Sequence, residues 1–143
     1  MKFLFTLSGI ILCSALSAQS ITGLWKTIDD ETGKPRSIVK IEERDGKYYG
    51  NIIKLFRSPE EDQDPVCKEC HGKKKDQRII GMEIITDMIY KKDDLVFEGG
   101  EILDPESGNV YDCRLWVGDD GNLRVRGYVM FLYRTQTWLP YEG

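Results

Sequence analysis

Two cysteines stand three positions apart in the string CKECHGKKK, and a histidine directly follows the second. This spacing is compatible with four kinds of chemistry. Cys67 and Cys70 could attach a haem with His71 as an axial ligand, or bind zinc together with Cys113 and His71. They could also exchange disulfides as an activated thiol pair, or form a local disulfide that closes one turn.

The residues around the motif favour the local disulfide. Haem attachment normally opens a helix, whereas this string lies in a polar segment between strand-like runs. Zinc usually needs a second pair of ligands, and His71 is the only histidine. Nothing near the pair resembles the strand–helix alternation of a thiol oxidoreductase. We therefore predict a Cys67–Cys70 disulfide without metal or cofactor; haem, zinc and thiol exchange stay open as alternatives.

The N-terminus predicts export. Lys2 is followed by an apolar run over Phe3–Leu12 and then by small residues, which is typical of a signal peptide over residues 1–18. Cleavage after Ala18 is favoured, and cleavage after Ser17 is the alternative. The apolar run is too short to span a membrane, and no later segment could. We expect a periplasmic or extracellular protein in an oxidising compartment, where disulfides persist.

The mature chain over residues 19–143 is long enough for one domain with one core. The formal net charge is −4 for the whole chain. The signal segment contains Lys2 and no acidic residue, so its loss makes the charge one unit more negative. This argues against a nucleic-acid partner, because phosphates attract a basic surface. With Cys13 also removed, three cysteines remain, and Cys113 is predicted to be a free thiol facing the core.

The rest of the chain has the pattern of an all-β protein, in which short runs rich in Ile, Val, Tyr and Trp alternate with glycine-containing turns. Such a meander must protect its edges, and closure into a barrel does so. We predict a single antiparallel meander closing into a calycin-like or lipocalin-like barrel, with the last run bending or breaking at Gly127. The predicted strands are Ile21–Asp29, Arg36–Glu43, Lys47–Phe56, Gln77–Thr86, Met88–Lys91, Leu95–Leu103, Asn109–Val117 and Leu123–Trp138.

Two further features of the sequence are a long segment without strand character and a pair of similar turns. The segment at about 57–76 has no strand character and carries an acidic cluster, the cysteine pair and three consecutive lysines. Loops of this length are uncommon in small domains and are usually functional or disordered. Two similar turns, Glu31–Lys34 and Glu106–Asn109, each follow an aspartate two residues upstream, Asp29 and Asp104. Each is expected to start a new strand.

Gly23 and Trp25 on the first predicted strand, with Arg134 on the last, resemble the calycin pattern. In that pattern a tryptophan plugs one end of the barrel and an arginine packs over its ring. The resemblance implies that Trp25 and Arg134 form such a barrel plug, with a cation–π contact between them.

Several phrases together resemble one family: GLWKTIDDETGKPRSIVKI, GKYYGNIIKL, CKECHG, IIGMEI, EGGEILDPESGNVYDCRL, LRVRGY and RTQTW. This string of motifs, from Gly23 to Trp138, is similar to the secreted bacterial family called domain of unknown function 2147. The resemblance implies a small exported barrel whose biochemical function is not established. It differs from the family pattern at Phe97, Met130 and Tyr133, and it supplies no catalytic residues.

The last predicted strand offers the best candidates for ligand binding. Arg126, Tyr128, Arg134 and Trp138 alternate onto one face, which would make an apolar pocket with guanidinium groups if it faced the interior. Carboxylates at Glu98, Glu101, Asp104 and Glu106 surround a turn, where they usually cap backbone amides. We therefore expect a non-enzymatic protein that binds a small apolar, amphipathic or anionic ligand. The alternative is an envelope protein-interaction module that uses the charged Cys-x-x-Cys loop.

Overall fold

A computed structural model describes residues 20–143; the predicted signal peptide at 1–18 lies outside the described residues. The described chain consists of strands, turns and one short 3-10 turn, η1 (Gly72–Lys74). The all-β prediction is therefore confirmed. The strands are β1 (Gly23–Ile28), β2 (Pro35–Arg44), β3 (Lys47–Leu55), β4 (Glu83–Lys91), β5 (Val96–Leu103), β6 (Val110–Val117), β7 (Leu123–Val129) and β8 (Leu132–Pro140).

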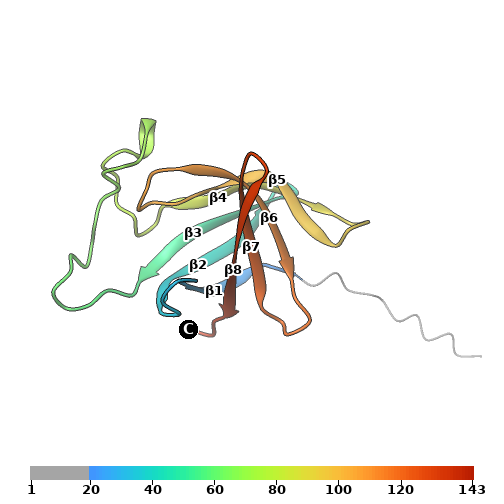
Figure 1. Ribbon diagram of the computed structural model, residues 1–143, viewed down its shortest axis with the longest axis horizontal. Helices are drawn as coiled ribbons and strands as arrows, with labels where there is room; N and C mark the ends of the chain where they lie inside the picture. The colour runs from blue at the N-terminus through green and yellow to red at the C-terminus, as the bar shows by residue number, and fades with distance from the viewer. Residues whose placement is uncertain (1–19) are drawn as a thin grey trace, which may run out of the picture.

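The strands form one closed antiparallel barrel in chain order, with β8 returning to pair with β1. The predicted meander is thus also confirmed. The β1–β2, β3–β4, β5–β6 and β7–β8 connections lie at one end of this barrel, and the other three connections lie at the opposite end with the start of β1. Figure 1 shows the long β3–β4 connection projecting beyond the strands. Among the described residues, no helix is long and apolar enough to cross a membrane.

Two boundaries differ from the sequence-based strands. The runs predicted at Gln77–Thr86 and Met88–Lys91 give one strand, β4, which begins only at Glu83, so the start of the first run is wrong. Within β4, Asp87 takes a φ of 56° without ending the pairing. The long run predicted at Leu123–Trp138 does not break at Gly127. It forms a β7–β8 hairpin that reverses at Met130 and Phe131, where Met130 has a φ of 56°. Tight hairpins usually mark such a position with Gly, Asn or Asp, so this turn carries no sequence signal.

Large apolar side chains fill the end of the barrel where β1 begins. Trp25 is 7% exposed and donates its indole N–H to the carbonyl of Ile21 at 2.8 Å. The ring of Tyr48 meets Phe97 edge to face at a centroid distance of 4.7 Å, which is a favourable aromatic geometry. This end is therefore closed by a packed core, whose further members are Ile21, Val39, Ile41, Ile85, Met88, Leu115 and Leu123.

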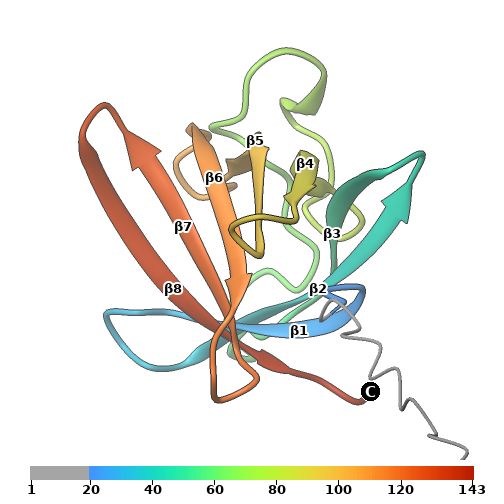
Figure 2. The ribbon, with the colours of Figure 1, turned by 90° about the vertical axis from the view of Figure 1, so that its right-hand side faces the viewer.

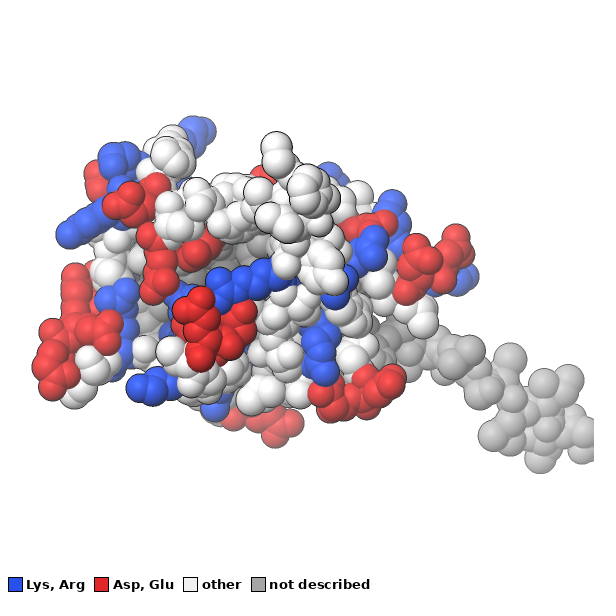
Figure 3. Space-filling model, in the orientation of Figure 1, with Lys and Arg blue, Asp and Glu red and all other residues white. Residues whose placement is uncertain are grey.

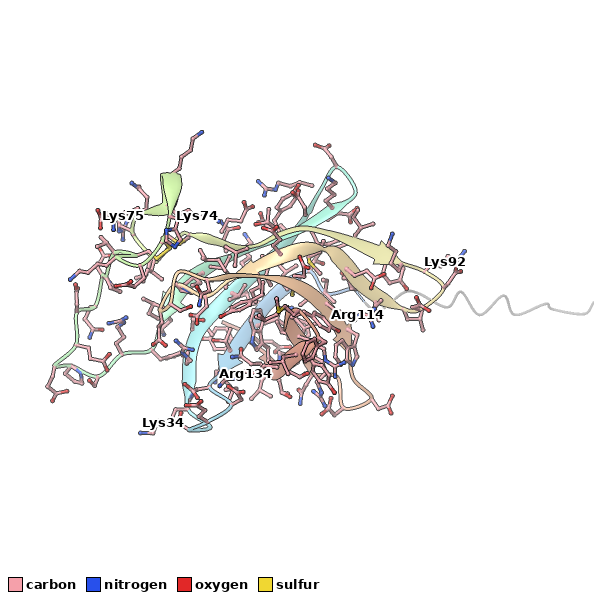
Figure 4. All side chains as sticks on the ribbon, turned by 45° about the horizontal axis from the view of Figure 1, so that its top comes forward. Lys34, Lys74, Lys75, Lys92, Arg114 and Arg134 are labelled. Carbon is pink, nitrogen blue, oxygen red and sulfur yellow. A yellow bond between two sulfur atoms is a disulfide. The ribbon has the colours of Figure 1, made fainter. Side chains whose placement is uncertain are left out.

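The β3–β4 connection is tied to the barrel around the cysteine pair. Cys67 and Cys70 form a disulfide with their Cα atoms 5.4 Å apart, and both side chains are buried. The backbone N–H of Cys67 donates to Gln77, and that of Asp76 donates back to Cys67. Figure 4 shows Lys74 and Lys75 beside the disulfide. The ammonium group of Lys74 donates to the backbone carbonyl of Glu83, at the start of β4, and that of Lys75 donates to the carbonyl of Lys68 within the loop.

The disulfide turn packs directly on the β5–β6 turn. A Cβ added at Gly108 would lie only 1.9 Å from the carbonyl oxygen of Glu69 and 2.4 Å from its carbonyl carbon. Those are backbone atoms, which cannot swing aside as the end of a flexible side chain does. Only glycine at position 108 therefore allows the loop to approach this closely.

Replacing Gly108 with alanine should therefore detach the loop as well as strain the turn. Gly121 is the matched control, because it has a similar positive φ (81° against 73°) with nothing within 4 Å of an added Cβ. Gly121→Ala should cost about 1–2 kcal/mol, the usual penalty of a left-handed conformation. Gly108→Ala should cost a further ~1–3 kcal/mol from overpacking. Urea unfolding measures both, and equal costs would contradict the close approach.

The third described cysteine, Cys113, lies in β6 and is 4% exposed. Burial raises the pKa of its thiol from an ordinary 9.0 to about 12, because the thiolate would lose its hydration. The unfolded thiol ionises first as the pH rises. The unfolded state therefore binds fewer protons than the folded state between about 9 and about 12, and this group lowers stability across that window.

Thiol labelling should distinguish the three cysteines in unreduced protein produced from Gln19 onward. With Ellman's reagent at pH 8, the native protein should react very slowly, since Cys113 is neutral and covered. In denaturant, one thiol per chain should react, because Cys67 and Cys70 are bonded to each other. Fast native labelling, or three reactive thiols after denaturation, would contradict this assignment.

Candidate functional site at the open end of the barrel

A cavity of about 830 Å³ opens at the barrel end that carries the β1–β2, β3–β4, β5–β6 and β7–β8 connections. Its size lies within the range of small-molecule sites in proteins. Figure 2 shows β7 and β8 leaning away from the β1–β2 hairpin on this side. The apolar part of its wall consists of Ile52, Leu55, Phe56, Ile79, Ile84, Ile102, Leu103, Val125, Val129, Leu132 and Trp138.

These side chains reach the interior because alternate residues of a strand face the same side. On β7, Leu123 fills the closed end, Val125 lines the cavity, and Gly127 follows on the same face nearer the opening. Gly127 leaves room there, since an added Cβ would make ordinary contacts with Tyr111 at 3.5 Å and Ile102 at 3.9 Å. The inward face of β7 is therefore filled by a side chain at the closed end and lines the cavity from Val125 onward.

Uncharged polar groups in the wall form hydrogen-bonded pairs. The buried hydroxyls of Thr27 and Ser37 lie 2.7 Å apart across β1 and β2, and Thr27 also accepts the backbone N–H of Ser37. The indole N–H of Trp138 donates to Gln136 at 3.1 Å. These pairs satisfy polar atoms that would otherwise be costly to bury. Neither pair needs a ligand to complete it.

The two similar turns noted in the sequence both stand at the rim of this cavity. Asp29 accepts the backbone N–H groups of Glu31 and Thr32, and Asp104 accepts the backbone N–H of Glu106 and the hydroxyl of Ser107. The hydrogen bonds from these amides lower the pKa of Asp29, which keeps it ionised. The echo in the sequence thus predicted two equivalent turns, without indicating that they share one rim.

Arg134 lies at the rim and does not cover the tryptophan. It donates from two nitrogens to both carboxylate oxygens of Asp30, and one nitrogen lies 3.4 Å from Glu31. This bidentate pair lowers the pKa of Asp30 and raises that of Arg134. Figure 4 shows Arg134 beside the first strands.

The predicted plug is therefore half wrong. Trp25 is buried at the closed end as expected, but it faces Pro140 on β8, six residues beyond Arg134. Six residues of extended strand span roughly 20 Å, too far for a guanidinium group to reach the ring. The sequence placed Arg134 on the correct strand but could not place it along the barrel axis.

The four candidate ligand residues separate onto two faces. Arg134 and Trp138 line the cavity, and their role in ligand binding stays a prediction. Arg126 and Tyr128 do not, because β7 presents Leu123 and Val125 inward and the residues between them face outward. Arg126 stacks outside the barrel over the rings of Trp116 and Tyr133, at 4.9 Å and 4.1 Å from the ring centroids. Their assignment to the pocket is corrected.

The other chemistry-bearing groups do not assemble at this site. Glu98 forms an ion pair with Arg114 at 2.8 Å, and Glu101 is exposed on the same strand, β5. His71 is exposed on the β3–β4 connection. Within residues 20–143, no three His, Cys, Asp or Glu side chains come together in a group that could hold a metal ion.

Several residues of the cavity were not anticipated. Arg36 reaches from β2 to Glu106 at 2.9 Å, and Arg57 reaches Glu61 at 3.6 Å, so both belong to the rim. Gly127 on β7 and Tyr111 on β6 are neighbours in the wall of the cavity. The turn echo at Asp29 and Asp104 was the one signal that could have identified the rim.

Comparison with solved structures supports this architecture. One match is the protein HP1028 from the human pathogen Helicobacter pylori, described as belonging to the lipocalin family. The two chains are 20% identical, and the TM-score is 0.71 over 86% of this chain and 84% of the other. At this identity the likeness shows the fold, which is lipocalin-like. No curated protein matches the chain.

The family resemblance noted in the sequence is borne out by the family model, which matches residues 23–139 and is described as an uncharacterised protein conserved in bacteria. The match covers all of β1 to β7 and nearly all of β8. The chain therefore belongs to the bacterial family DUF2147 and has a lipocalin-like, eight-stranded barrel.

Proposed function

We propose that this protein binds one small amphipathic molecule in the open end of its barrel, without transforming it. The observation that carries the proposal is the cavity of about 830 Å³, whose deep wall is apolar and whose rim is charged. Eight-stranded barrels are either filled by side chains or hold one small ligand. Here the filled part stops at the closed end, which leaves the second option for the rest.

The division of the wall suggests how such a ligand would lie. An apolar tail would contact Ile52, Ile84 and Val125, which lie below the charged rim. Transferring that tail out of water supplies most of the binding free energy, at about 25 cal/mol per Å² of apolar surface. A polar head would remain between the rim turns, where water and charged groups meet it. A purely polar solute would gain little from the deep wall.

Export fits this role, although it rests on the predicted signal at residues 1–18. A carrier in the periplasm or outside the cell would protect an amphipathic molecule from water while it moves between membranes or cells. The fold alone does not decide function, since lipocalin-like barrels serve many. The proposal therefore depends on the cavity and is tested there.

Filling the cavity at Gly127 should abolish binding. Gly127→Phe directs a ring into the interior beside Tyr111, whereas Gly127→Ala adds only a methyl group at ordinary contact distance. The probe is the uncharged fluorophore N-phenyl-1-naphthylamine, whose emission rises in apolar surroundings. Wild type and Gly127→Ala should bind it alike, and Gly127→Phe should bind at least about tenfold more weakly, since the ring occupies the probe's volume.

Thermal unfolding of all three proteins shows whether the variants keep the fold. Equal binding by folded Gly127→Phe and Gly127→Ala would mean that the probe lies elsewhere. No binding by the wild type would refute an open cavity.

A further inference from the structure

The charges that line the cavity are unbalanced. Five carboxylates belong to the lining and face three guanidinium groups, and no lysine or histidine is among the lining residues. Figure 3 shows acidic and basic side chains close together around a hollow on this face. The carboxylates are Asp29, Glu31, Glu61, Asp104 and Glu106, and the guanidinium groups are Arg36, Arg57 and Arg134.

Each of these arginines already has a carboxylate partner. Arg36 contacts Glu106 at 2.9 Å, and Arg57 contacts Glu61 at 3.6 Å. Arg134 is held by both oxygens of Asp30, which adds a further carboxylate beside the lining. An anionic head group would have to displace one of these carboxylates to reach a guanidinium group, and the displaced carboxylate would remain nearby.

The remaining carboxylates have no such neutralising partner of their own. Asp29 and Asp104 accept backbone and hydroxyl hydrogen bonds, which leave their negative charge in place. Glu31 is 79% exposed and shares Arg134 with Asp30. Lys34, which follows Glu31 in the β1–β2 turn, points away from the barrel in Figure 4. The rim is therefore a negative ring around an apolar interior.

We infer that the cavity selects amphiphiles with a cationic head group over anionic ones of the same chain length. This inference rests on the proposed function and specifies its ligand class. A cation at the rim would meet Asp29 or Asp104 without breaking an existing ion pair, and at Glu31 it would compete only with an arginine that Asp30 already holds. The sequence had included an anionic ligand among the expectations, because it revealed the arginines but not their partners. The preference arises from exposed charges, so it should weaken as salt screens them.

Competition against N-phenyl-1-naphthylamine tests the head group separately from the tail. The competitors are decyltrimethylammonium, decanol and decyl sulfate, each below its critical micelle concentration. Decyltrimethylammonium should displace the probe at about a tenfold lower concentration than decyl sulfate, with decanol between them. Raising the salt from about 0.05 M to about 0.5 M should reduce this ratio.

Two rim variants locate the preference, and one outer variant controls for net charge. Glu106→Gln releases Arg36 from its partner, and Glu31→Gln removes an exposed rim charge. Each should lower the cation preference by at least about twofold. Glu101→Gln makes the same charge change on an exposed side chain of β5 that is not part of the lining, and should leave the preference unchanged.

The possible outcomes separate this inference from the proposed function. Equal displacement by the charged competitors, or stronger displacement by decyl sulfate, overturns the head-group preference and leaves ligand binding intact. An equal effect of Glu101→Gln and the rim variants also overturns it, because the preference would then follow total charge. If none of the three competitors displaces the probe, the proposed function itself fails.

Discussion

The whole molecule depends on one short seam, where the last strand returns to the first. β1 and β8 pair through only two residue pairs, Trp25 with Pro140 and Lys26 with Leu139, whereas β7 and β8 pair along their full length. The backbone N–H of Tyr141 adds one bond to the carbonyl of Leu24. Without this seam both strands would be open edges, whose unpaired backbone groups favour aggregation.

The shortness of the seam also explains why the barrel opens on one side. Beyond Lys26 the two strands diverge, and the outer half of β8 pairs only with β7. The ion pair between Arg134 and Asp30 spans this divergence at the rim. The short β1–β8 pairing therefore closes one end of the barrel and leaves the other end open. Arg134, which was expected on the ring of Trp25, instead connects β8 to the β1–β2 turn at the open end.

The fold was largely predictable from the sequence, because its signals are local. Turns such as Asp45-Gly46 and Asp120-Gly121 separate runs of alternating apolar residues, and strands β1, β2, β3, β5 and β6 begin and end close to the predicted bounds. The hairpin at Met130 and Phe131 was missed, since neither residue marks a turn. That one turn decides which side of β8 faces the interior, so Arg126 and Tyr128 could not be separated from Arg134 and Trp138 by alternation alone.

The ion pairs of the cavity rim could not be predicted from the sequence, for a different reason. They join residues far apart in the chain, such as Arg134 with Asp30 and Arg36 with Glu106. Gly108 and Glu69 are also far apart in the chain, although the sequence shows both the Cys-x-x-Cys motif and the turn at Glu106–Asn109. Such contacts depend on the register of several strands at once, which a single sequence does not reveal. The charge of the rim therefore emerged only with the structure.

Native mass spectrometry of the protein purified from its own host tests the central claim most directly. An open, amphipathic cavity predicts one organic molecule per chain, released on denaturation and absent from Gly127→Phe purified in the same way. A bare chain in both preparations would contradict ligand binding in the barrel. A bound zinc ion or a covalent haem would instead show that the cysteine pair has another role.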